Sequence, residues 1–448
     1  MVKESYSELD KLLGLEVYAS DTEGIGGRIK LSIEDFIVRE ISLEGVKCSP
    51  SALFNESSGD YVWFVLEKRG VDTVTALRVV ARKLGLSSKI FSAAGLKDSK
   101  AVTYQLACAK DVSPKDLKGF VGASGKVKIH RAFRRPFKLK PGMLYGNEFE
   151  IKIREVHLSP EEAEVRIKKI LNELGEIGGV PNFYGYQRFG TIRPNTHIVG
   201  LHIIRGELKK AVEELLFHVY PEEPERSKIA RRNLRDSLDF NDALTYFPRR
   251  LHQERMMIRY LANHPGDYIG ALRSLPIEVR RLFIGAYQAF LFNKMLSLRL
   301  KRGLSLSRAV PGDIVIVFED KSKTSVKGIM RVNDANVDKV NEFISRGICS
   351  LALNVYGYNT IPARGVQGEI EKEILKEQKI SVRDFKIKHM PELATKGMLR
   401  VASFMPEDLK YSLDEECVVL NFTLRKGMYA TVFLREIIKP EDPLRAGF

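Results

Sequence analysis

The chain contains few of the residues that build metal centres and disulfide frameworks. Only four of its 448 residues are cysteine, and no two of them form a C-x-x-C pair. The closest of its eight histidines, His197 and His202, are too far apart to share a helix face. We therefore expect no structural metal and no disulfide framework, with core or surface roles for the histidines.

The sequence also lacks a hydrophobic run of membrane-spanning length. The longest candidate, residues 282–291, contains Gln288 and is followed by Asn293 and Lys294, whereas a spanning helix needs about 20 apolar residues. The N-terminal segment is acidic and polar, where a secretory signal would be basic and then apolar. These features predict no membrane partner and a cytoplasmic location.

Nucleotide-binding motifs are absent as well. Neither a P-loop nor a dinucleotide-binding fingerprint occurs in the chain, which argues against a metal- or nucleotide-dependent enzyme. We expect the protein to work without a cofactor. With 448 residues and 44% hydrophobic content, the chain can form two or three domains, each with its own core.

Positive charge is abundant and unevenly distributed. The net charge is +15, yet residues 1–60 carry six Lys/Arg and twelve Asp/Glu, a net charge of −6, so the remainder carries +21. Basic runs occur at residues 226–235 and 249–255. This distribution indicates a polyanionic partner, and nucleic acid is the first candidate.

The densest basic cluster is residues 126–140 (KVKIHRAFRRPFKLK), with seven Lys/Arg, no acidic residue and two phenylalanines. Such a ribbon is typical of a surface that follows nucleic-acid phosphates and adds aromatic contacts. The pattern also fits a solvated strand pair whose phenylalanines point inward. Within it, Arg134, Arg135 and Lys138 are the predicted RNA contacts.

Hydrophobic periodicity predicts mixed structure in the N-terminal part. Residues 28–67 fit strands, residues 73–84 fit a helix, and residues 102–108 fit a further strand. Ser159-Pro160-Glu161-Glu162 is a capping box that starts a helix ended by Gly175. The glycine-rich stretch that follows can approach a ligand closely, with Gly178 and Gly179 as a hinge.

The middle and the C-terminal part alternate between the two kinds of pattern. Residues 191–273 are helical and charged, and residues 276–301 form a long, largely buried helix. Strands at 313–318, 326–332 and 351–356, with a helix at 337–345, predict a compact α+β unit. Strands at 418–424 and 429–437 are predicted to form a hairpin across Arg425-Lys426-Gly427.

Two short segments carry the chemistry: residues 94–105 (AGLKDSKAVTYQ) and residues 181–190 (PNFYGYQRFG). The first places Asp98 in a turn, where an aspartate commonly caps or closes an Asx turn. A carboxylate can also attack or deprotonate a sugar carbon without a metal. The aromatic and amide groups of the second segment can hold a base that has left its stack. Together they indicate chemistry on a nucleotide.

Both segments resemble the signature motifs of the TruD family of pseudouridine synthases, which isomerise uridine in transfer RNA. The resemblance covers residues 28–190 and 395–438, whereas residues 191–275 match little. The further segments that carry it are KLSIEDFIVREI at 30–41, Gly146-Asn147 with the strand at 149–156, a helix of the family's insertion at 281–300, and FTLRKGMYATVFLREI at 422–437.

The resemblance implies catalytic roles for four residues. The family's catalytic aspartate falls on Asp98, and the basic residue of its first motif falls on Lys30, which otherwise reads as a surface lysine at the start of a strand. In the second loop Asn182 would contact the uracil edge or the aspartate, and Tyr184 would stack on the extruded base. The family commonly has phenylalanine where Tyr184 stands, so its hydroxyl is an open question.

RNA contacts are expected beside these residues. Lys97 is adjacent to the aspartate, although neighbouring side chains on an extended backbone point to opposite faces. Gln187 and Arg188 either contact RNA or brace the second loop.

The resemblance also implies the architecture. We expect an α+β fold with a pseudouridine synthase-type mixed, mainly antiparallel sheet and flanking helices, interrupted by an α+β insertion domain. Residues 1–190 and 395–448 would form the split catalytic domain, and residues 191–394 the insertion.

The function implied is a monomeric, cofactor-free and metal-free isomerase that converts a flipped uridine, U13 of tRNA, to pseudouridine. Two alternatives stay open. Because the insertion matches least, the enzyme could act on other RNA sites. A noncatalytic RNA-binding or folding factor could also use the same scaffold.

Overall fold

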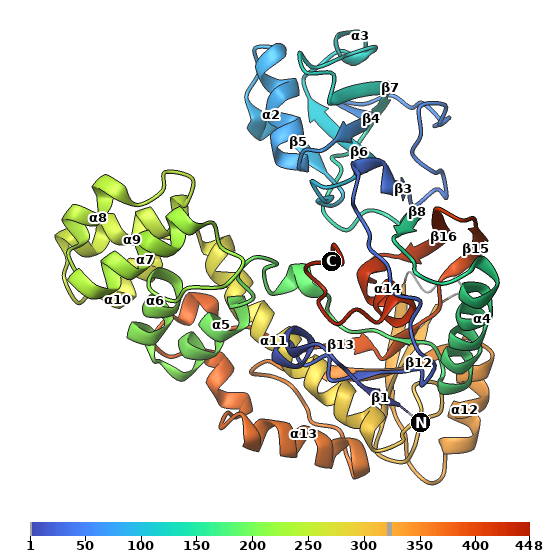
Figure 1. The fold of residues 1–448 in the computed structure, drawn as a ribbon. Helices are drawn as coiled ribbons and strands as arrows, with labels where there is room; N and C mark the ends of the chain where they lie inside the picture. Colours follow the sequence, from blue (N-terminus) through green and yellow to red (C-terminus); the bar gives the residue numbers. More distant parts are fainter. Residues whose placement is uncertain (1, 320–324) are drawn as a thin grey trace. The chain divides into compact units, whose positions relative to one another are not determined.

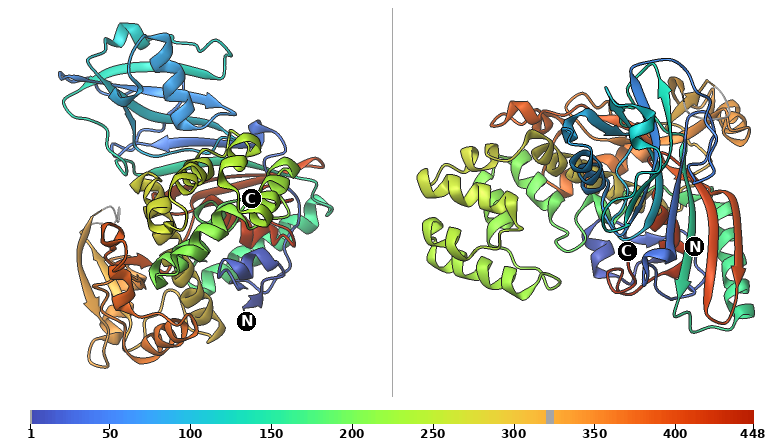
Figure 2. Two further views of the ribbon diagram at one scale, coloured as in Figure 1. Left: turned by 90° about the vertical axis from the view of Figure 1, so that its left-hand side faces the viewer. Right: turned by 90° about the horizontal axis from the view of Figure 1, so that it is seen from above.

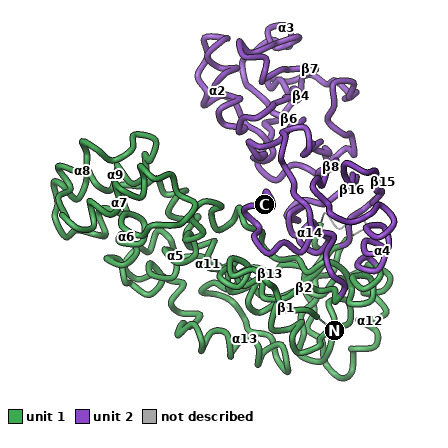
Figure 3. The backbone as a smooth tube through the Cα atoms, in the orientation of Figure 1, with its two compact units in different colours: residues 1–21, 172–404 green, residues 22–171, 405–448 purple. Residues whose placement is uncertain are grey.

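The computed structural model describes residues 2–319 and 325–448. Its chain divides into two compact units (Figure 3): unit 1 comprises residues 1–21 and 172–404, and unit 2 comprises residues 22–171 and 405–448. The predicted catalytic domain and insertion have other boundaries, and that division remains a prediction. Each unit is described by itself below.

Unit 2 is built on one large sheet. Its strands follow the order β15-β16-β8-β3-β6-β4-β7, with β5 paired to β6 (Figure 1). The pair β3–β6 is parallel, and the other pairs are antiparallel, which confirms the predicted mixed, mainly antiparallel sheet. The strands are β3 (Phe36–Ile41), β4 (Tyr61–Arg69), β5 (Phe91–Ala93), β6 (Val102–Lys110), β7 (Val127–Arg135), β8 (Gly146–Arg154), β15 (Glu407–Leu413) and β16 (Cys417–Arg425).

The apolar run in β4 is explained by burial on both faces of the sheet. Val62, Phe64 and Leu66 pack in one hydrophobic cluster with helix α2 (Thr73–Lys83), which lies against these strands (Figure 2). Trp63 and Val65, which alternate with them, belong to a second cluster. Successive side chains of a strand point to opposite faces, so a strand covered on both sides needs no polar alternation.

Helix α4 (Pro160–Ile177) begins at the predicted capping box: Ser159 Oγ accepts from the Glu162 amide, and Glu162 accepts from the Ser159 amide. The helix continues past Gly175, where it was predicted to end. Unit 2 also contains the short helix α3 (Pro114–Leu117).

The C-terminal segment is predicted correctly in one strand and wrongly in the next. Strand β16 pairs with β8 along nine residues, so it joins the N-terminal sheet. Residues 429–437, predicted as its hairpin partner, instead form helix α14 (Ala430–Ile438), all of whose side chains are buried. A short apolar run buried on every side has no distinguishing period, and its β-branched residues favoured the wrong choice. Within α14, Arg435 and Glu436 form a buried ion pair at 3.3 Å.

Unit 1 contains smaller sheets. A four-stranded antiparallel sheet has the order β11-β10-β12-β13, and two short ribbons pair β1 with β2 and β9 with β14. The strands are β1 (Lys3–Glu4), β2 (Val17–Tyr18), β9 (Val180–Pro181), β10 (Ile314–Phe318), β11 (Val326–Arg331), β12 (Cys349–Val355), β13 (Met398–Val401) and β14 (Ser403–Phe404). With α12 (Val337–Ser345) between β11 and β12, they confirm the predicted α+β order.

Helices dominate the rest of unit 1. The long helix α11 (Ile277–Lys301) is buried over most of its circumference, as predicted, and packs against α5. The helices α5–α10 gather around one hydrophobic cluster at one end of α11 (Figure 1). The others are α1 (Glu8–Leu12), α5 (Thr196–Arg205), α6 (Leu208–Leu216), α7 (Glu225–Ser237), α8 (Phe240–Tyr246), α9 (His252–Asn263), α10 (Tyr268–Arg273) and α13 (Gly365–Glu377).

The cysteines and the lengths of the helices bear on the expectations about disulfides and membrane spans. All four cysteines are free and buried. Within the described residues, no helix combines the length and apolar character that crossing a bilayer requires.

Candidate active site

Asp98 lies in the loop between β5 and β6 of unit 2, with 40% of its side chain exposed. Its Oδ2 is 2.9 Å from Nζ of Lys30, whose own side chain is only 6% exposed. The structure therefore brings these two sequence-predicted residues together. Over residues 2–319 and 325–448, no hydrogen bond or ion pair reaches the other carboxylate oxygen, Oδ1. One oxygen is held while the other can meet a substrate.

Lys30 is held in an unusual conformation. Its φ of +58° lies in the left-handed region, which non-glycine residues rarely adopt. Its ammonium also stands 4.6 Å from the centre of the Phe36 ring, a favourable cation–π arrangement. Strained backbone of this kind persists only where the surroundings fix it, so the position of the ammonium beside Asp98 is set by the fold.

Lys68 at the end of β4 supports the same loop and was not singled out from the sequence. Its side chain is fully buried, and its ammonium donates a hydrogen bond to the backbone carbonyl of Asp98. Burial lowers the pKa of Lys68 to about 8, while the negative charges of Asp98 and Asp72 act in the opposite direction. The sequence signal was present, since Lys68 ends a buried strand where a charge requires a partner.

A buried polar network holds the start of the loop. The Gln105 carboxamide donates from Nε2 to the Gly95 carbonyl at 3.0 Å. Thr73 Oγ1 donates to Gln105 Oε1 at 2.9 Å and accepts from the Lys97 amide at 3.0 Å. Thr73 and Gln105 are both almost completely buried. Because each polar group is satisfied, the network fixes the backbone that leads to Asp98.

Lys97 does not point to a surface where RNA could meet it. Its Nζ is 2.7 Å from Oε2 of Glu40, and the two side chains are 8% and 0% exposed. Burial raises the pKa of Glu40, and the charge of Lys97 opposes that rise. The structure thus places Lys97 in a buried ion pair with Glu40, because a buried carboxylate needs a cation as partner. The RNA contact of Lys97 stays a prediction.

Asn182, in unit 1, uses its amide within its own loop. Its Nδ2 donates to the Val401 carbonyl at 3.0 Å, and its Oδ1 accepts from Arg400 at 2.6 Å. Arg400 Nε also donates to the Asn182 carbonyl at 2.9 Å. Only 2% of the residue is exposed. In the structure this amide positions Arg400 and the loop, and its contact with a uracil edge or with the aspartate stays a prediction.

Tyr184 is fixed on three sides. Asn293 accepts from its backbone amide at 2.8 Å and donates to its carbonyl at 3.1 Å. Its ring meets the edge of Phe292 at a centroid distance of 5.6 Å, and the guanidinium of Arg400 lies 4.2 Å from the ring centre. Arg400 was missed from the sequence because no recognisable motif surrounds it. The arrangement gives a half-buried aromatic ring with a cation at its face.

Arg188 packs within unit 1, where its guanidinium lies 5.9 Å from the Tyr184 ring. A Cβ added to Gly285 of α11 would stand 2.2 Å from Arg188 Nη2, so this glycine makes room for the arginine. These contacts fit the bracing role of Arg188, and its RNA contact stays a prediction. Gln187 is exposed. The hinge expected at Gly178 and Gly179 has positive φ at both residues.

The basic ribbon divides into exposed and buried positions. Arg134 and Lys138 are exposed. The Arg135 side chain is 9% exposed and pairs at 2.6 Å with Glu44, whose side chain is 48% exposed, so the structure shows a salt bridge at this position and the RNA contact of Arg135 stays a prediction. Arg135 occupies an inward position of β7 and its guanidinium lies 5.1 Å from the Phe133 ring, which leaves the exposed arginine and lysine as candidates for phosphate contact.

A further feature is the distribution, in the described part of the chain, of the side chains that bind metal ions. No group of three or more His, Cys, Asp or Glu side chains is arranged to hold a metal ion there. The chemical resources of the two loops are one partly exposed carboxylate, a lysine beside it and a positioned aromatic ring.

A mixed, mainly antiparallel sheet that presents an aspartate on a fixed loop is the arrangement expected of a pseudouridine synthase, and the comparisons agree. The model of the family described as tRNA pseudouridine synthase D (TruD) matches residues 12–437. The chain belongs to the TruD family. Members of this family isomerise uridine to pseudouridine in tRNA.

Relatives match along nearly the whole chain. Two proteins named "Probable tRNA pseudouridine synthase D" are 37% identical in Methanosarcina acetivorans, covering 98% of both chains, and 38% identical in Pyrococcus abyssi, covering 94% of this chain and 98% of the other. A crystal structure named for tRNA pseudouridine synthase D (TruD) from Methanosarcina mazei is 36% identical, with a TM-score of 0.81, over 98% of this chain and 99% of that one.

Proposed function

We propose that this protein converts uridine 13 of tRNA to pseudouridine, with Asp98 as its single catalytic carboxylate. The observation that carries the proposal is the pair formed by the partly exposed Asp98 and the buried Lys30 ammonium, 2.9 Å apart on a fixed loop. A carboxylate can act as nucleophile or base, and the Lys30 ammonium holds one oxygen of Asp98 in place.

The reaction is an isomerisation, so no atom is gained or lost overall. The bond between N1 of uracil and C1′ of ribose breaks, the base turns, and C5 forms a new bond to C1′. Asp98 either attacks C1′ and is later displaced by C5, or removes the C2′ proton and later returns it. The C5 proton leaves to water, and N1 gains one.

The second loop suits the same substrate. Uridine inside a folded RNA must leave its stack before an enzyme can reach C1′, and aromatic faces stabilise an extruded base. Tyr184 supplies such a ring in this proposal. Arg134, Lys138 and Gln187, which are exposed, are proposed to contact the RNA backbone, because phosphate contacts supply most of the affinity for a folded RNA.

We also propose that residues 1–190 and 395–448 act as the catalytic domain and residues 191–394 as an insertion, in a monomeric protein. The pairing of β16 with β8 supports this division, because it brings the two ends of the chain into one sheet.

Release of tritium tests the activity. A tRNA transcript labelled at uracil C5 should lose tritium to water with the parent protein, and Asp98→Asn should slow this at least ~10³-fold. Asp60→Asn, which changes an exposed aspartate of the same unit, serves as the matched control and should behave as the parent.

The same assay separates the alternatives. A transcript with cytidine at position 13 should release nothing, and release from it would show that another uridine is the target. Binding of tRNA without release by the parent would support the noncatalytic factor instead. Equal rates for Asp98→Asn and the parent would disprove the role of Asp98.

A further inference from the structure

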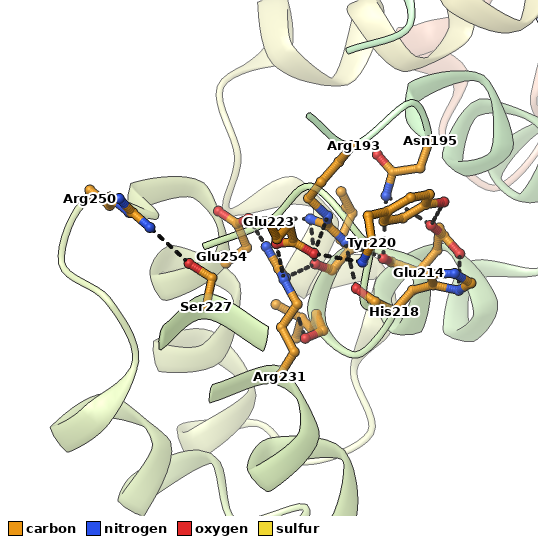
Figure 4. A network of polar contacts seen from close by, with 12 residues as sticks. Arg193, Asn195, Glu214, His218, Tyr220, Glu223, Ser227, Arg231, Arg250 and Glu254 are labelled. Carbon is orange, nitrogen blue, oxygen red and sulfur yellow. Dashed lines mark hydrogen bonds and ion pairs between the residues drawn. The ribbon is translucent and has the colours of Figure 1, made fainter. Parts of the chain in front are cut away.

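The helical part of unit 1 holds two contrasting groups of arginines, and neither takes part in the proposed chemistry. The first group is internal. Arg231 is fully buried and lies 2.8 Å from Glu223 and 2.8 Å from Glu254. Arg193 joins the same acids at 3.4 and 3.5 Å (Figure 4). Buried guanidiniums with carboxylate partners serve the packing of the helices.

The second group lines a pocket. Four arginines surround a cavity of about 780 Å³ together with Pro224, Leu244, Thr245, Phe247 and Pro248. The arginines are Arg226, Arg249, Arg250 and Arg255. No acidic residue lines this space, which we call the arginine pocket. A volume of this size lies within the range that ligand pockets occupy.

The four arginines differ in how firmly they are held. Arg255 donates to the carbonyls of Leu244 and Phe247 at the end of α8, and Arg250 donates to Ser227 Oγ at 3.1 Å (Figure 4). Arg226 and Arg249 are exposed, and neither has a carboxylate within ion-pair distance in the part of the chain that the structure describes. Arg250 and Arg255 are thus held by neutral acceptors, and none of the four pocket arginines pairs with a carboxylate among the described residues.

A neighbouring pocket shows that this lack of acids is specific. The space around Arg235, about 600 Å³, is also lined by Lys210 but contains Glu213 and Glu214. Arg235 itself pairs with Asp236 at 2.9 Å, and Arg232 on the same helix pairs with Glu225 at 3.5 Å. The exposed Arg232 and Arg235 of α7 therefore have acidic partners, whereas no ion pair is found for the four arginines of the arginine pocket in the described residues.

We propose that the arginine pocket binds the phosphodiester backbone of the tRNA substrate, as a site separate from the loop that carries Asp98. This rests on the proposed function for the identity of the RNA. Arginine forks bind phosphate oxygens in a bidentate manner. The apolar part of the lining, Leu244 and Pro248, suits the sugar and base of a nucleotide better than it suits a bare anion.

Filter binding tests the site. The double variant Arg226→Ala/Arg249→Ala should weaken tRNA binding about 10-fold or more, and should reduce the slope of log K against log salt by about two, because each lost phosphate contact releases about one counterion fewer. The matched control Arg232→Ala/Arg235→Ala removes two arginines of the same segment that have acidic partners, and should change binding less than ~3-fold. Thermal melts of both variants exclude unfolding. Equal loss of affinity in the two double variants would overturn the proposal.

Kinetics separate this site from the proposed function. With tritium release, the arginine-pocket variant should raise KM about 10-fold with little change in kcat, because binding remote from the reacting bond is uniform. If the parent releases no tritium but the variant still loses tRNA affinity, the function fails and the pocket stands. Binding of inorganic pyrophosphate that this variant abolishes, with tRNA affinity unchanged, would make the pocket a small-anion site and disprove the proposal.

Discussion

The loop of Asp98 and the loop of Asn182 and Tyr184 are held by different physical means. Beneath Asp98 the supports are buried charges: Lys68 under the carbonyl and Lys97 paired with Glu40. Around Tyr184 the supports are amides, aromatic edges and one arginine. The Asp98 carboxylate is partly exposed, whereas the Asn182 amide hydrogen-bonds to groups of its own unit. The comparison teaches that one motif residue can be available to a ligand while another holds its own loop in place.

The two loops should therefore respond to opposite ends of the pH scale. His197, which packs beside the second loop between Phe189 and Phe290, has its pKa lowered by burial to about 4. Lys68 has its pKa lowered by burial to about 8. At low pH, protonation of the buried His197 should destabilise the packing beside the Tyr184 loop. At high pH, Lys68 should lose the positive charge that lies beneath Asp98.

The largest effect is expected from His197. Between pH 6.5 and about 4 the unfolded chain binds a proton at this residue and the folded chain does not, so the free energy of unfolding falls as the pH falls through this window. The free energy of unfolding should be about 3 kcal/mol higher above pH 6.5 than below pH 4 because of this one residue. Urea unfolding across the window should show a shallower decline for His197→Phe than for the parent.

The exposed His252 supplies the control. His252→Phe should keep the steep acid decline of the parent, because this variant leaves the buried His197 unchanged. Parallel pH curves for the parent and His197→Phe would contradict the assignment.

Arg400→Met should lower kcat about 10²-fold, because displacement of a positioned loop by an ångström can cost that much. Arg400 contacts both Asn182 and the Tyr184 ring, so its loss frees the two together. Single-turnover kinetics measure the effect, with the exposed Arg383 changed to Met as control. Unchanged chemistry with only a raised KM would show that Arg400 serves RNA binding instead.

Lys68→Met should lower kcat about 10-fold at neutral pH by removing the donor that holds the Asp98 carbonyl. Its pH profile distinguishes this role from a general loss of packing. In the parent, kcat/KM should decline as the pH rises through about 8, because Lys68 loses its charge there. The variant should lack this alkaline limb, and persistence of the limb would assign it to another group.

Tyr184 gives the smallest and most specific comparison. Tyr184→Ala should lower turnover about 10-fold, whereas Tyr184→Phe, which keeps the aromatic face, should lower it less than ~3-fold. Stopped-flow or quench measurements with the labelled transcript give both values. Equal losses would show that the hydroxyl, and not the ring, matters.

Much of the fold was predictable where a segment had a clear period. The helices α2, α11 and α12, the strands β6 and β10, and the capping box before α4 all follow their patterns. Helix α14 was not predictable in this way, because all nine of its positions are buried and no polar face marks a period. The same holds for the candidate site. Asp98 and Lys30 could be predicted because they lie in recognisable motifs, whereas Lys68 and Arg400 belong to no motif or regular spacing in the sequence.

By itself, the sequence determined which residue types are available: a carboxylate in a turn, a glycine-rich aromatic loop and an excess of positive charge without paired cysteines. The tertiary structure decided which of these groups face outward. Lys97 and Arg135 are as basic as Arg134, yet their side chains are buried, Lys97 beside the buried Glu40 and Arg135 beside the half-exposed Glu44. The physical reason is that a charge removed from water must find an opposite charge, and that partner comes from a distant part of the chain.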